Sequence, residues 1–180
     1  MKNFCISLFL IAIIIVTIAV GVQTPSTNNQ EYLRIHIRAN SNSEQDQLVK
    51  MTVKDGVVNY LTPIISQCKT KNEAVNALNI QKENLQKVIN DILKSNGFNY
   101  LSNVKIANEE FPLRVYENVT LKEGYYDAVI VELGKAEGDN WWCVMYPPLC
   151  FYGDTENVKY KFKLKEIIDA FFNKNSEESN

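Results

Sequence analysis

The sequence has little of what most catalytic and nucleic-acid-binding proteins depend on. It contains one histidine, and 21 acidic side chains outnumber 19 basic ones, which gives a net charge of −2 at pH 7. Neutralising phosphates requires a surplus of Lys and Arg, so we expect no nucleic-acid partner. The chain has no glycine-rich phosphate loop and no HExxH or GxSxG motif. CxxC and HxxH spacings are also missing, so we expect no metal site and no cofactor.

The single histidine limits the catalytic mechanisms that are possible. Any Ser-His or Cys-His mechanism would have to use His36 as its base. His36 lies between Arg34 and Arg38 in an alternating segment, and nearby positive charges lower the basicity of an imidazole. We therefore favour a structural histidine and predict that the protein is not an enzyme. The alternative is an exported hydrolase that acts on cell-wall or peptide material through His36.

The N-terminus carries a long apolar run. Lys2 precedes residues 4–22, which contain no charged residue. A helix of this length spans about 28 Å, which is close to the thickness of the bilayer core. A basic start followed by such a run predicts an export signal over residues 1–22. The small residues Ala19 and Gly21 permit cleavage after Gly21, and the segment is also long enough to remain as a membrane anchor.

The rest of the chain divides into four parts. Residues 23–31 are polar and have no periodicity, which predicts a linker. Residues 32–152 have the patterns of one folded domain. Residues 153–175 predict a C-terminal amphipathic helix, best placed from Tyr160 to Asn173 and packed on that domain. Residues 176–180 predict a disordered tail.

Hydrophobic periodicity in the domain predicts a strand, then helices, then a run of strands. Apolar residues at helical spacing indicate a helix from Ser43 to about Leu61, which Pro63 should end or kink. A short helix near residues 72–78 and a clearer one before Gly97 follow. Alternation indicates strands at residues 32–40, 103–106, 114–121, 125–133 and 141–146. This order predicts an α+β fold with a mainly antiparallel sheet of about five strands packed against two or three helices.

Two segments carry unusual concentrations of large polar and aromatic side chains. The polar face of the first strand is rich in hydrogen-bond donors, and the segment at residues 140–151 holds both tryptophans. Adjacent residues of a strand point to opposite faces, so one tryptophan can enter the core while the other needs a cover or a partner. Two packed core tryptophans are the alternative. If the first and last strands neighbour each other in the sheet, the two segments become adjacent.

Arg114 lies between apolar and aromatic residues and has two possible roles. It could bind a carboxylate of a partner or a local acid such as Glu109 or Glu110. We include it among the candidate partner-binding residues, which are Arg34, His36, Arg38, Asn40, Arg114, Trp141, Trp142, Tyr146, Pro147 and Pro148.

Export changes the interpretation of the cysteines, because oxidising compartments permit disulfides. Cys143 and Cys150 bracket a six-residue segment whose double proline can reverse the chain and bring their Cα atoms within reach. We predict a disulfide between them, with free thiols as the alternative. Cys68 would then be unpaired, either buried or available to another chain.

Taken together, several of these blocks resemble the stage II sporulation protein R family. The resemblance rests on LRIHIRANSNS at residues 33–43, FPLRVY at 111–116, GYYDA at 124–128 and GDNWWCVMYPPLCF at 138–151. It extends over about residues 32–152 in the family's order, and the block of tryptophans, cysteines and prolines is its most specific part.

The resemblance implies a role in endospore formation. Members of the family are made in the forespore and exported into the space between its two membranes. There they activate a membrane-embedded aspartic protease, which processes the precursor of a mother-cell sigma factor. The family has no established catalytic residues, so the resemblance implies a signalling protein that acts by binding. The expected partners are that protease and, if the N-terminal segment is uncleaved, the membrane. A structural protein anchored in the forespore membrane is a third hypothesis.

Overall fold

The computed structural model describes residues 29–177 apart from 117–118 and 155–157. The predicted signal or anchor segment and most of the linker lie outside these residues. Among the helices that the structure describes, none is long and apolar enough to cross a membrane. The elements are the 3-10 helix η1 (Asn29–Glu31), the strands β1 (Leu33–Arg38), β2 (Ser102–Phe111), β3 (Arg114–Tyr116), β4 (Val119–Leu121), β5 (Gly124–Leu133) and β6 (Asn140–Tyr146), and the helices α2 (Glu44–Ile65), α3 (Lys71–Ser95), α4 (Leu149–Asp154) and α5 (Val158–Glu177).

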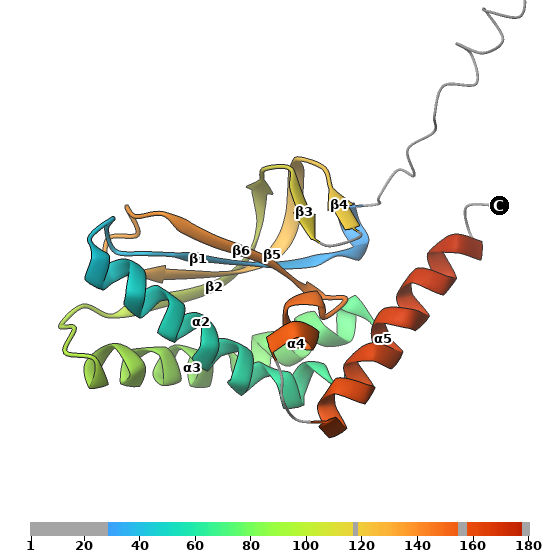
Figure 1. Cartoon of the computed structure of the whole chain (residues 1–180), viewed down its shortest axis with the longest axis horizontal. Coiled ribbons are helices and arrows are strands. Elements are labelled where there is room, and N and C mark those ends of the chain that lie inside the picture. The colour runs from blue at the N-terminus through green and yellow to red at the C-terminus, as the bar shows by residue number, and fades with distance from the viewer. Residues whose placement is uncertain (1–28, 117–118, 155–157, 178–180) are drawn as a thin grey trace, which may run out of the picture.

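The main sheet is mixed and has four strands in the order β2-β5-β1-β6 (Figure 1). β1 runs parallel to β5 and antiparallel to β6, while β2 runs antiparallel to β5. The predicted α+β class is confirmed, but the sheet has four strands instead of about five, and it is mixed because β1 and β5 pair in parallel while the other two pairings are antiparallel. β5 returns antiparallel to β2 and lies between β2 and β1. It runs in the same direction as β1. Alternation marks a strand without marking its neighbour, so it could not predict this order.

The remaining two strands form a separate antiparallel ribbon. β3 and β4 lie between β2 and β5 in the chain, so the ribbon is the tip of the β2–β5 hairpin. It joins the main sheet where Phe111 pairs with Gly124. Gly124 has a φ of 146°, which L side chains rarely adopt, and this explains the glycine at the point of return.

Helix α2 begins as the sequence predicts. The hydroxyl of Ser43 accepts a hydrogen bond from the backbone N–H of Asp46 at 3.2 Å, which is an N-cap. The helix continues through Pro63 to Ile65, beyond the predicted end near Leu61. Gly56 lies where α2 crosses α3, and a Cβ there would overlap the side chain of Ile92. The glycine therefore permits a close approach of the two helices.

Helix α3 is one continuous helix where the sequence predicted two. Thr70 caps it, and Gly97, with a φ of 83°, follows its C-cap as predicted. The C-terminal helix α5 is longer than predicted and ends at Glu177. Ser176 and Glu177 are therefore helical, although the sequence placed them in a disordered tail.

The helices cover one face of the sheet, and the ribbon lies on the other (Figure 1). The main core lies on the helical side and includes Leu33, Ile35 and Ile37 from β1, with Leu164 contributed by α5. A smaller core lies under the ribbon and consists of Tyr32, Phe111, Leu121, Tyr126, Ala128, Ile130 and Val144. Leu33 to Ile37 are all buried, so the predicted half-buried first strand is covered on both faces.

Candidate partner-binding face

The sheet face that turns away from α2 and α3 carries the donors of β1. We call it the ribbon face and define it by these main-sheet side chains: Asn103, Lys105 and Glu109 of β2, Tyr126 and Glu132 of β5, Arg34, His36 and Arg38 of β1, and Trp142 of β6. Register explains the grouping, because residues paired directly across adjacent strands share a face. β1 lies in the middle of this set.

The first and last strands of the main sheet are neighbours, so the two segments singled out by the sequence meet. His36 of β1 pairs with Trp142 of β6. Their rings stack with centroids 3.5 Å apart. Trp141 points the other way, opposite Ile37, and packs against the main core. One tryptophan therefore belongs to the ribbon face and the other does not.

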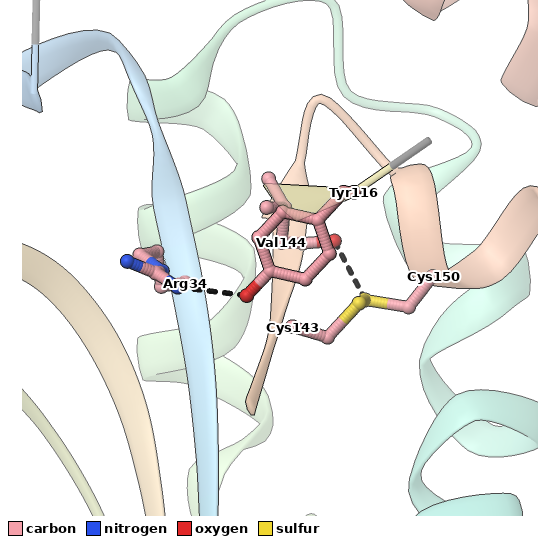
Figure 2. The surroundings of a disulfide bond; sticks show 5 residues. All are labelled: Arg34, Tyr116, Cys143, Val144 and Cys150. Carbon is pink, nitrogen blue, oxygen red and sulfur yellow. Dashed lines mark hydrogen bonds between the residues drawn. A yellow bond between two sulfur atoms is a disulfide. The ribbon is translucent and has the colours of Figure 1, made fainter. Parts of the chain in front are cut away.

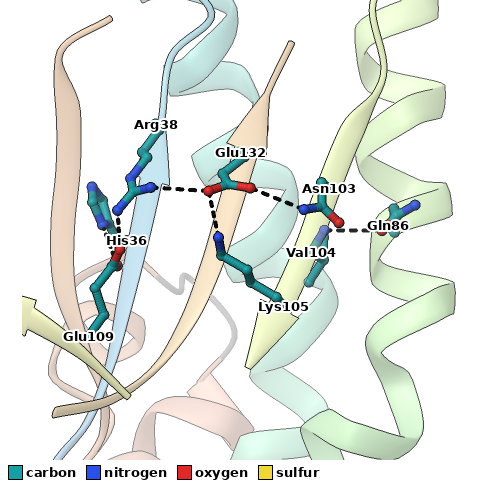
Figure 3. Close-up of polar contacts among 8 residues, drawn as sticks. All are labelled: His36, Arg38, Gln86, Asn103, Val104, Lys105, Glu109 and Glu132. Carbon is teal, nitrogen blue, oxygen red and sulfur yellow. Dashed lines mark hydrogen bonds and ion pairs between the residues drawn. The ribbon is translucent and has the colours of Figure 1, made fainter. Parts of the chain in front are cut away.

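One end of the ribbon face is a network of paired charges (Figure 3). Arg38 donates to Glu132 at 3.0 Å and also bonds to Glu109. Lys105 and Asn103 donate to Glu132 at 2.7 and 3.0 Å. Partial burial alone would raise the pKa of Glu132, but the hydrogen bonds from Lys105 and Asn103 and the charges of Lys105 and Arg38 lower it. The cations and anions at this end compensate one another.

His36 links that network to the aromatic part of the face. Its side chain is buried, and Nδ1 lies 3.0 Å from a carboxylate oxygen of Glu109. Burial lowers the pKa of His36, and the charge of Arg38 lowers it further, against the opposing effect of Glu109. In the neutral imidazole, Nδ1–H donates to Glu109. No serine or cysteine among the described residues hydrogen-bonds to His36, so the geometry provides no nucleophile for it to activate.

Arg34 lies at the other end of the ribbon face, fully buried under the ribbon. Its Nη2 donates to the hydroxyl of Tyr116 at 2.7 Å (Figure 2). The guanidinium carbon lies 4.2 Å from the ring centroid of Phe111 and 4.8 Å from that of Tyr126. Burial lowers the pKa of Arg34, although arginine stays charged at any physiological pH. Aromatic rings, not acids, surround this cation.

Arg114 is the exposed cation of the ribbon. Its guanidinium lies 5.9 Å from the ring centroid of Trp142, which is a cation–π contact. Glu109, one of the acids considered for it from the sequence, binds Arg38 and His36 instead. The neighbours Leu113 and Val115 are 53% and 64% exposed. On β3, Arg114 points to the same face as Tyr116, and Val115 points to the opposite face.

The other candidate residues from the sequence lie away from the ribbon face. Asn40 donates to Asp46 and accepts from the backbone N–H of Lys135, each at 2.9 Å, and so fastens a loop. The Tyr146 hydroxyl donates to the Lys69 carbonyl. Pro147 and Pro148 are buried and lead into α4. Their predicted role in binding a partner stays a prediction.

Cys143 and Cys150 form a disulfide with their Cα atoms 6.1 Å apart (Figure 2). The bond ties the middle of β6 to α4, and Cys143 is followed by Val144, which pairs with Arg34. Cys68 is a free, buried thiol, and burial raises its pKa, followed by the effect of Glu73. A thiol that stays protonated is a poor nucleophile.

Several residues on or around the ribbon face were not among the candidates from the sequence. Phe111, Tyr116 and Tyr126 surround Arg34, and Glu109 and Glu132 hold the paired end. Strand alternation does place Glu109 and Lys105 on one face of β2. It cannot show which strand lies beside β2, so the partners of Arg38 were not predictable.

The fold and this face define a class of protein. It is an α+β domain in which the charged side chains of the ribbon face either form ion pairs or pack against aromatic rings. Within the part of the chain that the structure describes, no group of histidine, cysteine and acidic side chains is arranged to hold a metal ion. The one histidine is buried, and among the described residues no serine or cysteine hydrogen-bonds to it.

Comparison with known proteins shows the family to which the chain belongs. The profile of the family described as stage II sporulation protein R matches residues 29–156. A protein named stage II sporulation protein R, from Bacillus subtilis (strain 168), is 32% identical over 129 residues, covering 71% of this chain and 58% of that protein. No solved structure matches. The chain belongs to the stage II sporulation protein R family, as the sequence predicted, and the family connects it to sporulation.

The match covers only part of each protein. It spans little more than half the length of the curated relative. It ends at residue 156, so helix α5 lies beyond the region shared with the family profile, although Leu164 of α5 is part of the main core.

Proposed function

We propose that this protein is an exported signal of sporulation that activates a membrane-embedded aspartic protease by binding to it. The protease would process the precursor of a mother-cell sigma factor. The protein would pass from the forespore into the intermembrane space, either secreted or held by its N-terminal segment. The observation that carries the proposal is the family match, which covers the domain from η1 to the end of α4.

The chemistry of the ribbon face supports binding over catalysis. A ligand activates a receptor only if it binds the active state better than the inactive one, and this requires a specific contact surface, not a reactive group. The exposed ribbon offers Arg114 together with Leu113 and Val115, and Trp142 lies partly exposed beside it. Arginine and tryptophan are typical anchors of protein interfaces, so Arg114 and Trp142 are the residues that we expect to contribute most to binding.

A binding measurement tests this proposal. The full chain, in its oxidised form, would be titrated against the extracytoplasmic part of the sporulation protease, and precursor processing would be followed in cells that contain both proteins. We expect saturable binding that weakens at least tenfold in Arg114→Ala and in Trp142→Ala.

A matched control is Leu101→Ala, because Leu101 is 69% exposed and precedes β2 at the far end of that strand from the ribbon. It should bind and signal like the wild type. If a folded, oxidised chain neither binds the protease nor promotes processing, the proposed function is wrong.

A further inference from the structure

We propose that Arg34 is the binding site for a carboxylate of the partner protein, and that the Tyr116 hydroxyl occupies part of this site in the free protein. The identity of the partner rests on the proposed function, whereas the carboxylate site rests on the structure alone. Four observations carry the inference.

Arg34 is a buried cation without a counter-charge among the described residues. Its side chain is 0% exposed, and its hydrogen bond to Tyr116 is to a neutral phenol. Nε and Nη1 have no hydrogen-bond acceptor within the described part of the chain. Buried charges in proteins are normally paired, and an unsatisfied charged donor is costly. The aromatic rings around Arg34 offset only part of this cost.

The unused donors are arranged for a carboxylate. In a guanidinium, Nε–H and one N–H of Nη2 point from the same edge, and a carboxylate accepts from both in parallel. Tyr116 occupies Nη2, and Nε on that edge has no acceptor. The neighbouring Tyr126 hydroxyl donates to the Lys122 carbonyl. One phenol therefore uses half of an edge that two carboxylate oxygens would use completely.

The part of the protein that covers Arg34 is a ribbon whose strands do not pair with the main sheet. Tyr116 lies on the ribbon, whose two strands have three residues each and pair with each other, not with the main sheet. A two-stranded ribbon has little stability of its own. The ribbon continues from the Phe111–Gly124 end of the β2–β5 hairpin and is held on the sheet by side-chain packing of Leu121, Val119 and Tyr116 instead of strand pairing. A partner that bound the ribbon would be placed to move Tyr116 away from Arg34.

The charge around the site favours an anion. The exposed Arg114 on the same ribbon adds a second positive charge near Arg34. The acids at the other end of the ribbon face, Glu109 and Glu132, are already paired with Arg38, His36 and Lys105. An incoming carboxylate would therefore meet two arginines whose charges the described acids do not neutralise.

The test uses acetate as the probe and the full chain in detergent micelles. The Nε–H resonance of Arg34 would be followed by NMR during titration with sodium acetate, and with sodium chloride at matched ionic strength. It would be assigned through Arg34→Lys. We expect the resonance to respond to acetate and not to chloride. In Tyr116→Phe, which removes the competing hydroxyl, the half-maximal acetate concentration should fall at least threefold.

Arg38 provides the internal control, because two acids already occupy its guanidinium. Its Nε–H resonance should not respond to acetate in either protein. If the Arg34 resonance of folded Tyr116→Phe ignores acetate, or responds equally to chloride, Arg34 is only a structural arginine in an aromatic box and the inference is wrong.

The same variants separate this inference from the proposed function. Arg34→Lys keeps the charge and loses the two-donor edge. An acetate response without any binding to the protease would leave the carboxylate site intact and overturn the proposed function. Saturable protease binding that Arg34→Lys leaves unchanged would overturn the carboxylate site and leave the proposed function intact.

Discussion

Arg34 and Arg38 lie on the same strand and the same face, yet their surroundings are opposite. Arg38 is 26% exposed and pairs with Glu109 and Glu132. Arg34 is fully buried and has aromatic rings and one phenol hydroxyl as neighbours. Two arginines on one β-strand thus differ. Arg38 forms ion pairs, whereas Arg34 has no acidic partner among the described residues.

The difference shows how each arginine relates to stability. Pairing offsets the cost of taking Arg38 partly out of water, so Arg38 contributes to folding. An unpaired buried charge lowers stability, and apolar residues of similar volume often replace such groups without loss. Arg34 lowers stability and is covered by Tyr116 of the ribbon. A role in binding therefore explains it more readily than a role in folding.

The largest expected effect on stability comes from truncating Phe111, whose ring contacts both Arg34 and His36 on the ribbon face. Phe111 is buried, contacts the guanidinium of Arg34 and packs edge-on against His36. Phe111→Ala should lower the free energy of unfolding by about 3–5 kcal/mol, because it leaves a cavity in the smaller core. Chemical denaturation measures the change.

Leu113→Ala, two residues further along and exposed, is the matched control and should change stability by less than about 0.5 kcal/mol. Equal effects of the two substitutions would show that Phe111 does not hold the ribbon end of the sheet together.

The two arginines themselves give the next largest contrast. Arg38→Met leaves Glu109 and Glu132 without their shared partner and should cost about 1–2 kcal/mol of unfolding free energy. Arg34→Met leaves no acid unpaired among the described residues and removes a buried charge. It should therefore be neutral or stabilising by up to about 1 kcal/mol. Melting temperatures of the two variants test this, and a larger loss for Arg34→Met would refute the contrast.

A smaller effect is expected from pH. Burial holds the pKa of His36 below its ordinary value of 6.5, so the unfolded chain takes up a proton before the folded protein does. The contribution of neutral His36 is complete above pH 6.5 and declines as the pH falls towards the folded pKa. The slope from this one group is at most about 1.4 kcal/mol per pH unit.

Denaturation between pH 5 and 7 measures this slope, and His36→Gln should flatten it. The pKa values of the Asp46 and Glu132 carboxyls are lowered from 3.8 and 4.5. These groups lose their stabilising contribution below pH 5, so they add little to the slope between pH 5 and 7. An unchanged slope in His36→Gln would mean that His36 titrates normally in the folded protein.

Much of the fold was predictable because local patterns report local structure. The alternation in residues 33–38 and 125–133, and the cap at Ser43, indicated elements that the structure contains. The double proline between Cys143 and Cys150 indicated the disulfide that the structure forms. The family was also recognisable from short blocks of residues alone. Each of these signals lies within about a dozen residues.

Only the tertiary structure decided how those pieces meet. In the tertiary structure β5 pairs in parallel with β1, Glu109 and Glu132 form ion pairs with Arg38, and the ribbon covers Arg34. These contacts join residues more than 70 positions apart. The order of strands and the packing of the whole chain determine them, because an arginine on a strand has the same local pattern whether an acid, a phenol or water lies opposite it.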